Sequence, residues 1–324
     1  MGTVTNSIGS AGGRDYSTIA LWEAALPANL VTDGNSYVGQ CYNDSEFVVA
    51  GNVVTISGIT TDSSHTILLT TGPGQSFRDN ANAQTNALRY NASNGVGIRS
   101  TINAATTVVV NNNYASLSNL QFQYDGNGNY GSALVLSLSG NSGPARAGTN
   151  LTNCIVSAGN TAANLCSAGG GYAGFGVVAN CLFICATNNY FGAATSGMSA
   201  TDTVGTIVNC TSVSLGSTGG PKFSFFGTSS AKLINCAGFG ALTGFSDSAT
   251  AAGNNNATDF ATILFGSSNQ TSLTFANQFV ATTSFASADL NAAINIKNFG
   301  LRNKPGITQS EGIPCACNVE STNL

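Results

Sequence analysis

A chain of 324 residues in which only 7% are charged differs from ordinary soluble domains, where about a quarter of the residues are charged. No run approaches the ~18 unbroken apolar residues of a membrane span, and 42% hydrophobic residues exclude a disordered chain of low hydrophobicity. Ten lysines and arginines against a formal net charge of -4 leave no basic surface for nucleic acid.

Glycine, asparagine, serine and threonine take the place of charge in this sequence. There are 39 glycines and only 6 prolines. These residues favour tight turns and pleated strands over helices. We therefore expect an all-β, turn-dense protein with a buried core and no membrane contact.

The chain opens with an expected N-terminal arm and capping helix, residues 1–30. The stretch MGTVTNSIGSAGG, residues 1–13, has neither the positive start nor the apolar run of a secretory signal. We expect an extended, mobile or partner-docked arm on a protein that folds in a cytoplasm. In such a reducing compartment most of the 9 cysteines should be thiols that pack as small hydrophobic groups.

The next element is a helix predicted over residues 15–27, DYSTIALWEAALP. Ser17 or Asp15 can cap its first turn, and proline ends it. An amphipathic helix next to stacked strands is most simply a lid over an open end, with Trp22 as its plug. Its apolar face consists of Ile19, Trp22 and Leu26.

Residues 31–287 are predicted to form a single-stranded parallel β-helix. The pattern apolar–any–asparagine–cysteine or leucine occurs five times, as LSNL, LTNC, VANC, IVNC and LINC. The spacings are 34, 27, 29 and 26 residues by subtraction, and a period of about 27 belongs to solenoid architectures. The repeated asparagines are Asn119, Asn153, Asn180, Asn209 and Asn235.

The asparagine has a physical role in this pattern, because it enters the left-handed region at modest cost. One such residue between two short strands turns the chain sharply. When coils stack at roughly 4.8 Å, the corner amides form a ladder and the following cysteines form an internal file. We expect a right-handed coil. The file consists of Cys154, Cys181, Cys210 and Cys236.

The last segment, residues 288–324, departs from the repeat and is predicted to be an irregular C-terminal cap or tail. It ends in PCACNVESTNL, which holds Cys315 and Cys317. Three interpretations stay open for this pair: inert thiols, half of a metal site, or an intermolecular disulfide to a neighbouring subunit. Since 9 is odd, at least one cysteine cannot pair within the chain.

Three stretches near the N-terminus carry a family resemblance: GRDYSTIALWEAALPANLV (13–31), YVGQCYNDSEF (37–47) and GQSFRDNANAQTNALRYNASNGVGIR (74–99). They resemble the opening of β-helical proteins of the pectin-lyase-like fold that tailed bacteriophages and prophages encode. The resemblance implies a virion component, assembled in the bacterial host cytoplasm. It brings no functional residue that can be carried over to this chain.

Catalysis is the main alternative, and glycoside hydrolysis needs two carboxylates flanking one bond. The acids stand apart along the chain, and Asp44 with Glu46 and Arg78 with Asp79 are expected to be solvated or structural pairs. His65, after a turn, is expected at a surface or edge. We predict no catalytic, cofactor-binding or metal-binding residue. The scattered acids are Asp62, Asp79, Asp125, Asp202, Asp247, Asp259 and Asp289.

The expected function is therefore structural: a head decoration or minor capsid protein that binds the phage shell and copies of itself, as a homotrimer. The alternative is a tail fibre or tailspike-like module that binds or depolymerises a host surface polysaccharide. Asn, Ser and Thr on the coil flanks would bond sugars in that case. A bacterial adhesin is a third interpretation, which the absent export signal disfavours.

Overall fold

The computed structural model describes fourteen longer and shorter stretches of the chain between residues 2 and 273. These are residues 2–49, 54–80, 90–102, 106–126, 131–136, 148–158, 166–171, 176–185, 193–195, 206–214, 223–225, 232–239, 243–245 and 256–258, together with 261, 266–267, 269 and 271–273.

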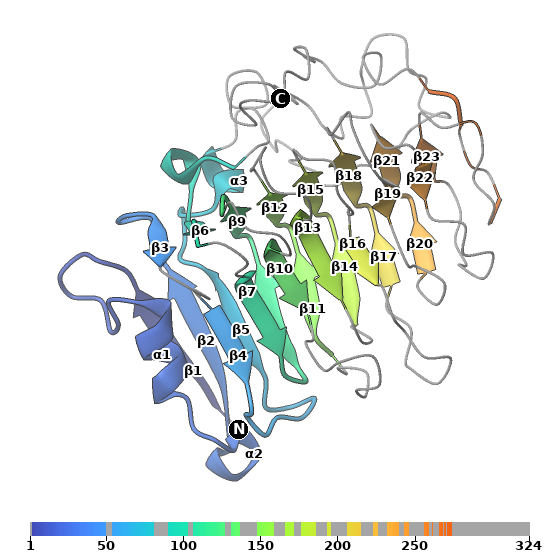
Figure 1. Ribbon diagram of the computed structural model, residues 1–324. Helices are drawn as coiled ribbons and strands as arrows, with labels where there is room; N and C mark the ends of the chain where they lie inside the picture. Colours follow the sequence, from blue (N-terminus) through green and yellow to red (C-terminus); the bar gives the residue numbers. More distant parts are fainter. Residues whose placement is uncertain are drawn as a thin grey trace.

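The described strands stack into long parallel sheets, as Figure 1 shows from the blue N-terminal end to the orange coils. The first sheet runs in the order β1 (Gly2–Ile8), β2 (Asn35–Cys41), β5 (Ile67–Thr71), β8 (Ala115–Ser118), β11 (Asn150–Thr152), β14 (Val177–Ala179), β17 (Thr206–Val208) and β20 (Lys232–Ile234).

Two further sheets complete each coil. The second sheet contains β3 (Phe47–Val49), β6 (Gly97–Ser100), β9 (Gln121–Tyr124), β12 (Ile155–Ala158), β15 (Leu182–Cys185), β18 (Thr211–Ser214), β21 (Ala237–Phe239) and β23 (Ala257–Thr258). The third contains β4 (Val54–Ser57), β7 (Thr106–Asn111), β10 (Gly131–Leu136), β13 (Cys166–Gly171) and β16 (Ala193–Thr195), and β19 (Phe223–Phe225) pairs with β22 (Thr243–Phe245).

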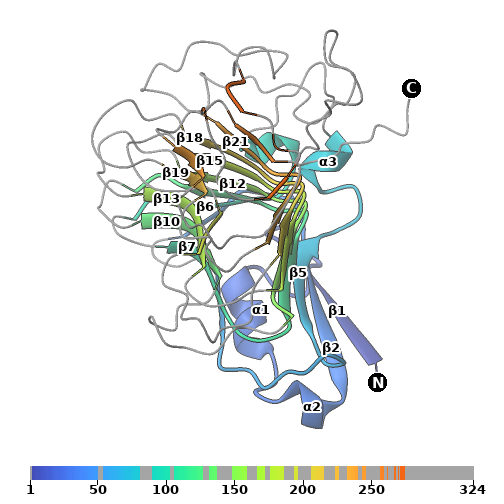
Figure 2. The ribbon, with the colours of Figure 1, turned by 90° about the vertical axis from the view of Figure 1, so that its right-hand side faces the viewer.

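Every strand pairing in the described stretches is parallel. Apart from β1 and β2, which are neighbours in the first sheet, successive strands of the chain lie in different sheets and pair with their counterparts in the next coil. In Figure 2 the three sheets surround one narrow interior. The chain is an all-β parallel β-helix, so the predicted fold class is confirmed.

The interior is filled by apolar side chains that repeat at the same register from coil to coil. In the first sheet one such column is Leu69, Leu117, Leu151, Val178, Ile207 and Leu233, and in the second it includes Ile98, Phe122, Val156 and Phe183. All of these side chains are buried. Alternation of inward and outward residues along each short strand places them there.

The N-terminal end differs from the expected extended, mobile or partner-docked arm. Residues 2–8 form strand β1, which pairs in register with β2 over its whole length. The alternating apolar and hydroxyl residues of GTVTNSI suit a sheet, and β2 offers the matching edge. This segment is therefore the first strand of the β-helix, which begins at residue 2 rather than at residue 31.

The capping helix is present, although its start differs from the predicted one. α1 (Ile19–Ala25) begins after Thr18, whose side chain accepts a hydrogen bond from the Leu21 amide, so neither Ser17 nor Asp15 is the N-cap. Asp15 instead accepts hydrogen bonds from the backbone and side chain of Ser7. In Figure 2, α1 lies between the first and third sheets. The other short helices are α2 (Leu30–Asp33), α3 (Phe77–Asn80) and the 3-10 turn η1 (Ala92–Asn94).

Candidate functional site

The five predicted corner asparagines share one backbone conformation. Their φ angles are 61° (Asn119), 55° (Asn153), 54° (Asn180), 52° (Asn209) and 56° (Asn235). Asparagine tolerates this left-handed region better than other residues with a Cβ. Each of them joins a strand of the first sheet to a strand of the second sheet.

Four of these residues form a continuous side-chain ladder, which we call the corner ladder. Asn180 donates from Nδ2 to Oδ1 of Asn153 at 3.2 Å, and Asn209 donates to Asn180 at 3.2 Å. Asn235 donates to Asn209 at 3.3 Å. Asn119 departs from the pattern, because its Nδ2 donates to the hydroxyl of Thr70 at 3.4 Å. The spacing of 34 residues before Asn153 marks the same discontinuity in the sequence.

The predicted thiol file lies directly behind the corner ladder. Its four members are fully buried free thiols. Cys181 donates to the carbonyl of Ala179 at 3.2 Å, and Cys210 to that of Val208 at 3.3 Å. Burial raises the pKa of the Cys181 and Cys236 thiols well above the ordinary value, so they stay protonated. The four thiols of the file pack in the interior as small, fully buried groups.

Helix α1 acts as the lid of the N-terminal end, and its Trp22 side chain occupies space beside Gly39, which has no side chain of its own. Leu69 follows Gly39 in the register of the first sheet, so Gly39 lies at the head of an inward column. A Cβ on Gly39 would lie 2.8 Å from Cζ2 of Trp22 and 2.9 Å from Cδ1 of Ile8. The indole of Trp22 is fully buried there, as the predicted plug. Only glycine in this position leaves room for it.

Side chains satisfy backbone groups at the ends of the sheets. Asp15 accepts from the Ser7 amide at the edge of β1 at 2.7 Å, and Glu23 of α1 accepts from the Thr55 amide at the edge of β4 at 2.9 Å. At the other end, Asn256 accepts from the Cys236 amide at 2.9 Å and donates to the Leu233 carbonyl at 3.0 Å. These side chains replace the backbone partners that a further strand would offer. They therefore protect the sheet edges from pairing with a strand of another chain.

An arginine-centred cluster was not predicted from the sequence. Arg99 of β6 lies 2.6 Å from Asp125 through Nε and 3.6 Å from Glu46 through its terminal nitrogen. Tyr90 donates its hydroxyl to Glu46 at 2.6 Å, and the Gln123 amide donates to Asp125. Burial, together with the bond to Glu46, raises the pKa of the Tyr90 hydroxyl. Two carboxylates thus meet at one guanidinium on the outer side of the second sheet.

Strand register brings the residues of this cluster together, and knowledge of that register would have revealed the cluster from the sequence. Arg99 pairs with Val48 on one side and with Gln123 on the other. Asp125 follows β9, and Glu46 precedes β3, so each acid flanks the same stack of strands. The prediction that Asp125 stands alone and that Glu46 belongs with Asp44 is wrong. Asp44 instead bonds Arg14 at 2.8 Å, and the Arg14 guanidinium also lies over the Tyr42 ring.

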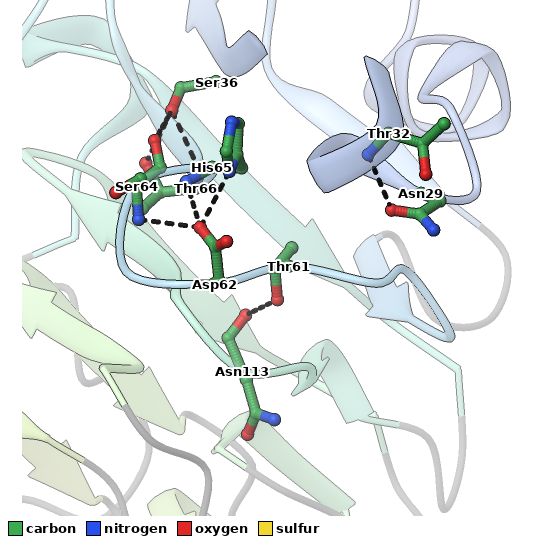
Figure 3. A network of polar contacts seen from close by, with 9 residues as sticks. All are labelled: Asn29, Thr32, Ser36, Thr61, Asp62, Ser64, His65, Thr66 and Asn113. Atoms are coloured by element: carbon green, nitrogen blue, oxygen red, sulfur yellow. Dashed lines mark hydrogen bonds and ion pairs between the residues drawn. The ribbon is translucent and has the colours of Figure 1, made fainter. Parts of the chain in front are cut away.

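The remaining local groups have structural roles. Asp79 accepts from the Ser76 amide at the start of α3. His65 Nδ1 lies 2.8 Å from Oδ1 of Asp62, which also accepts from the amides of Ser64 and His65 (Figure 3). Hydrogen bonds from the backbone and from the imidazole lower the pKa of the Asp62 carboxyl. In Figure 3 this network closes the turn before β5.

Some predicted residues lie outside the described stretches: Cys315, Cys317, Asp202, Asp247, Asp259 and Asp289. Among the residues that are described, no group of three or more histidine, cysteine, aspartate or glutamate side chains has the arrangement of a metal site. No helix in the described part of the chain has the length and hydropathy for a membrane crossing.

Comparisons with known proteins show a likeness among solved structures. No protein-family model matches this chain, and no curated protein matches it. Among solved structures, the chain is similar to pectin methylesterase from carrot, with 11% sequence identity and a TM-score of 0.35. That match covers 95% of this chain and 92% of the carrot enzyme.

Proposed function

We propose that this chain is a structural component of a tailed-phage virion, a head decoration or minor capsid protein that binds the shell and neighbouring copies of itself as a homotrimer. The resemblance of residues 13–31, 37–47 and 74–99 to phage β-helical proteins supports this proposal. The protein would be assembled in the bacterial host cytoplasm and would reside in the virion.

The observation that carries the proposal is the continuous stack of coils with satisfied edges. Strands pair in register from Gly2 to Thr258, and the corner ladder ties four successive coils together. Such a column is stiff, because every coil is bonded to both neighbours. Asp15 and Asn256 satisfy backbone groups at two sheet edges, which limits unspecific strand addition. A stiff rod of this kind suits mechanical reinforcement.

The experiment is quantitative mass spectrometry of purified particles, with the major shell protein as internal standard. A head decoration role predicts a copy number that scales with the number of shell subunits. A tail component would give only a few copies per particle. Complete absence from purified particles would reject both virion roles.

The second candidate function is a tail fibre or tailspike-like module that binds or depolymerises host surface polysaccharide. The arginine-centred cluster favours it, since Arg99, Glu46 and Asp125 are partly exposed and combine donors with acceptors. Val48 beside Arg99 is 48% exposed, and Ile102 is 39% exposed. Sugar rings present hydroxyl edges and apolar faces that fit such a mixture.

This alternative is tested by incubating host capsule or outer polysaccharide with the purified protein and measuring binding and chain length. Glu46→Gln and Asp125→Asn should each abolish the effect, whereas Asp44→Asn, which removes a carboxylate outside the cluster, should leave it intact. Equal activity in all three variants would exclude the cluster as the glycan site.

A further inference from the structure

Strand β1 is the terminal strand of the first sheet, so one of its two edges faces away from β2. Its even-numbered residues bond the β2 side, because the Ile8 carbonyl accepts a hydrogen bond from the Tyr42 amide at 2.8 Å. The backbone groups of successive residues point to opposite edges of a strand. The amides and carbonyls of Thr3, Thr5 and Ser7 therefore point outward, away from β2.

Only the C-terminal part of this outer edge is protected. The Ser7 amide donates to Asp15 at 2.7 Å, and the Ser7 carbonyl accepts from the Tyr16 amide at 3.0 Å. Within the described part of the chain, no group bonds the outward amides and carbonyls of Thr3 and Thr5. Both threonine residues are exposed. The protection that Asp15 gives thus ends at Ser7, and Thr3 and Thr5 form an open edge.

Strand β1 also lacks the features by which proteins usually prevent strand addition. Its sequence, GTVTNSI, contains no charged side chain and no proline, and it pairs with β2 without a bulge. Two exposed apolar side chains, Leu21 and Val31, belong to α1 and α2, which lie at the same end of the β-helix (Figure 1). This end therefore offers a partner both backbone hydrogen bonds and apolar surface.

We propose that the open edge of β1 pairs with β1 of a second copy of this chain, in antiparallel orientation about a two-fold axis at Val4. Thr3 then lies opposite Thr5 of the second copy, and Thr5 lies opposite Thr3 of the second copy. Residues opposite each other in this way exchange both of their backbone hydrogen bonds. The pairing would join two β-helices at their N-terminal ends, and it does not depend on the virion role.

The length of the open edge favours a second copy over a longer strand. An incoming strand that continued past Thr5 would meet Asp15 and Tyr16, which already bond Ser7. In the two-fold arrangement the open groups of one copy are used by those of the other, as an isologous interface requires. Threonine side chains opposite each other on one face are favourable, and β1 brings no charge that would repel its copy.

Cross-linking tests the position of the two-fold axis. Val4 lies opposite Val4 of the second copy in a non-hydrogen-bonded pair, where the Cα atoms are about 4.5 Å apart. This separation permits a disulfide, so Val4→Cys should give a covalent dimer when the protein is oxidised with copper phenanthroline. Thr3→Cys is the matched control, because its two cysteines would be diagonal neighbours about 7–8 Å apart. Oxidised wild-type protein shows the contribution of the native cysteines.

Charged variants test the antiparallel register in solution by sedimentation velocity. Thr3→Lys combined with Thr5→Glu places opposite charges across the axis, so this double variant should associate as well as wild type. Thr3→Lys combined with Thr5→Lys places like charges there, and its dissociation constant should be on the order of 10-fold higher. Equal weakening of both double variants would exclude the antiparallel register.

Thr5→Pro tests the backbone hydrogen bonds themselves. Proline removes only the outward amide of residue 5 and leaves the bonds to β2 in place, so circular dichroism should show an unchanged fold. The dissociation constant of the β1-mediated dimer should rise on the order of 30-fold, because each copy loses one donor.

Three results would overturn the inference. The first is the absence of a cross-link through Val4→Cys at high protein concentration, and the second is an equal cross-link through Thr3→Cys. The third is association that Thr5→Pro leaves unchanged, because such association would belong to another surface. Loss of the dimer in Thr5→Pro would leave the virion role untouched, since particle copy number tests that role separately.

Discussion

The side chain of Asn209 donates a hydrogen bond to that of Asn180, 3.2 Å away in the preceding coil, and both residues have φ angles near 53°. This relationship joins conformation and stacking, because only a residue that tolerates the corner can present its amide along the stack. Replacement of Asn209 separates the contribution of the left-handed backbone conformation to stability from that of the side-chain hydrogen bond.

Asn209→Ala should destabilise the protein by about 2–3 kcal/mol, since alanine loses the hydrogen bond and is strained at positive φ. Asn209→Gly loses the bond but avoids the strain, so its cost should be about 1 kcal/mol lower. Urea unfolding of the two variants checks this order. Equal losses of unfolding free energy in the two variants would show that backbone strain at the left-handed corner contributes nothing to the cost of Asn209→Ala.

Gly39→Ala tests how Trp22 of α1, the lid helix, packs beside Gly39. The added methyl group would lie within 3 Å of Trp22 and Ile8, so we expect a loss of about 1–3 kcal/mol and a more exposed indole. Gly12→Ala is the matched control, because a Cβ there meets nothing within 4 Å. Thermal unfolding and tryptophan emission give both readouts. A red-shifted emission in the control variant would argue against a local effect at Gly39.

Asn256→Asp tests the end of the first sheet. The buried Asn256 amide donates to Leu233 and accepts from Cys236, and aspartate cannot make the first of these bonds. The expected destabilisation is about 1–3 kcal/mol. Asn29→Asp serves as control, because Asn29 caps α2 and aspartate caps a helix equally well. Denaturant midpoints that shift equally in both variants would refute a special role for Asn256.

The ion pair between Arg14 and Asp44 predicts a dependence on acid pH. The side-chain bond from Arg14 lowers the pKa of the Asp44 carboxyl below its ordinary value of 3.8. Its contribution to stability is present above that value and is lost as the pH falls through the lowered pKa. Asp44→Asn should therefore be less stable than wild type at neutral pH and indistinguishable from it in strong acid. A constant difference across urea titrations at both extremes would contradict this assignment.

Much of the fold followed from a pattern that each coil repeats. The sequence predicted the corner ladder and the thiol file because Asn180, Asn209 and Asn235 keep the same neighbours at similar spacing. The terminal strand β1 was missed, since Gly2–Ile8 resembles no repeat and its partner β2 lies beyond two helices.

The arginine-centred cluster was missed for a related reason. Glu46, Arg99 and Asp125 are 53 and 26 residues apart by subtraction, and only strand register brings them together. The helix cap was placed wrongly because Asp15 has a competing partner in Ser7. Local spacing indicates a corner, whereas contacts between coils depend on loop lengths that no local rule specifies.

The most direct test of the proposed structural role is a cryo-EM reconstruction of purified particles that contain this protein. The account predicts β-helical rods with strands about 4.8 Å apart, seated on the outer face of the head shell in regular arrays. Density for the protein at the tail tip alone, or a fold without stacked asparagine corners, would contradict it.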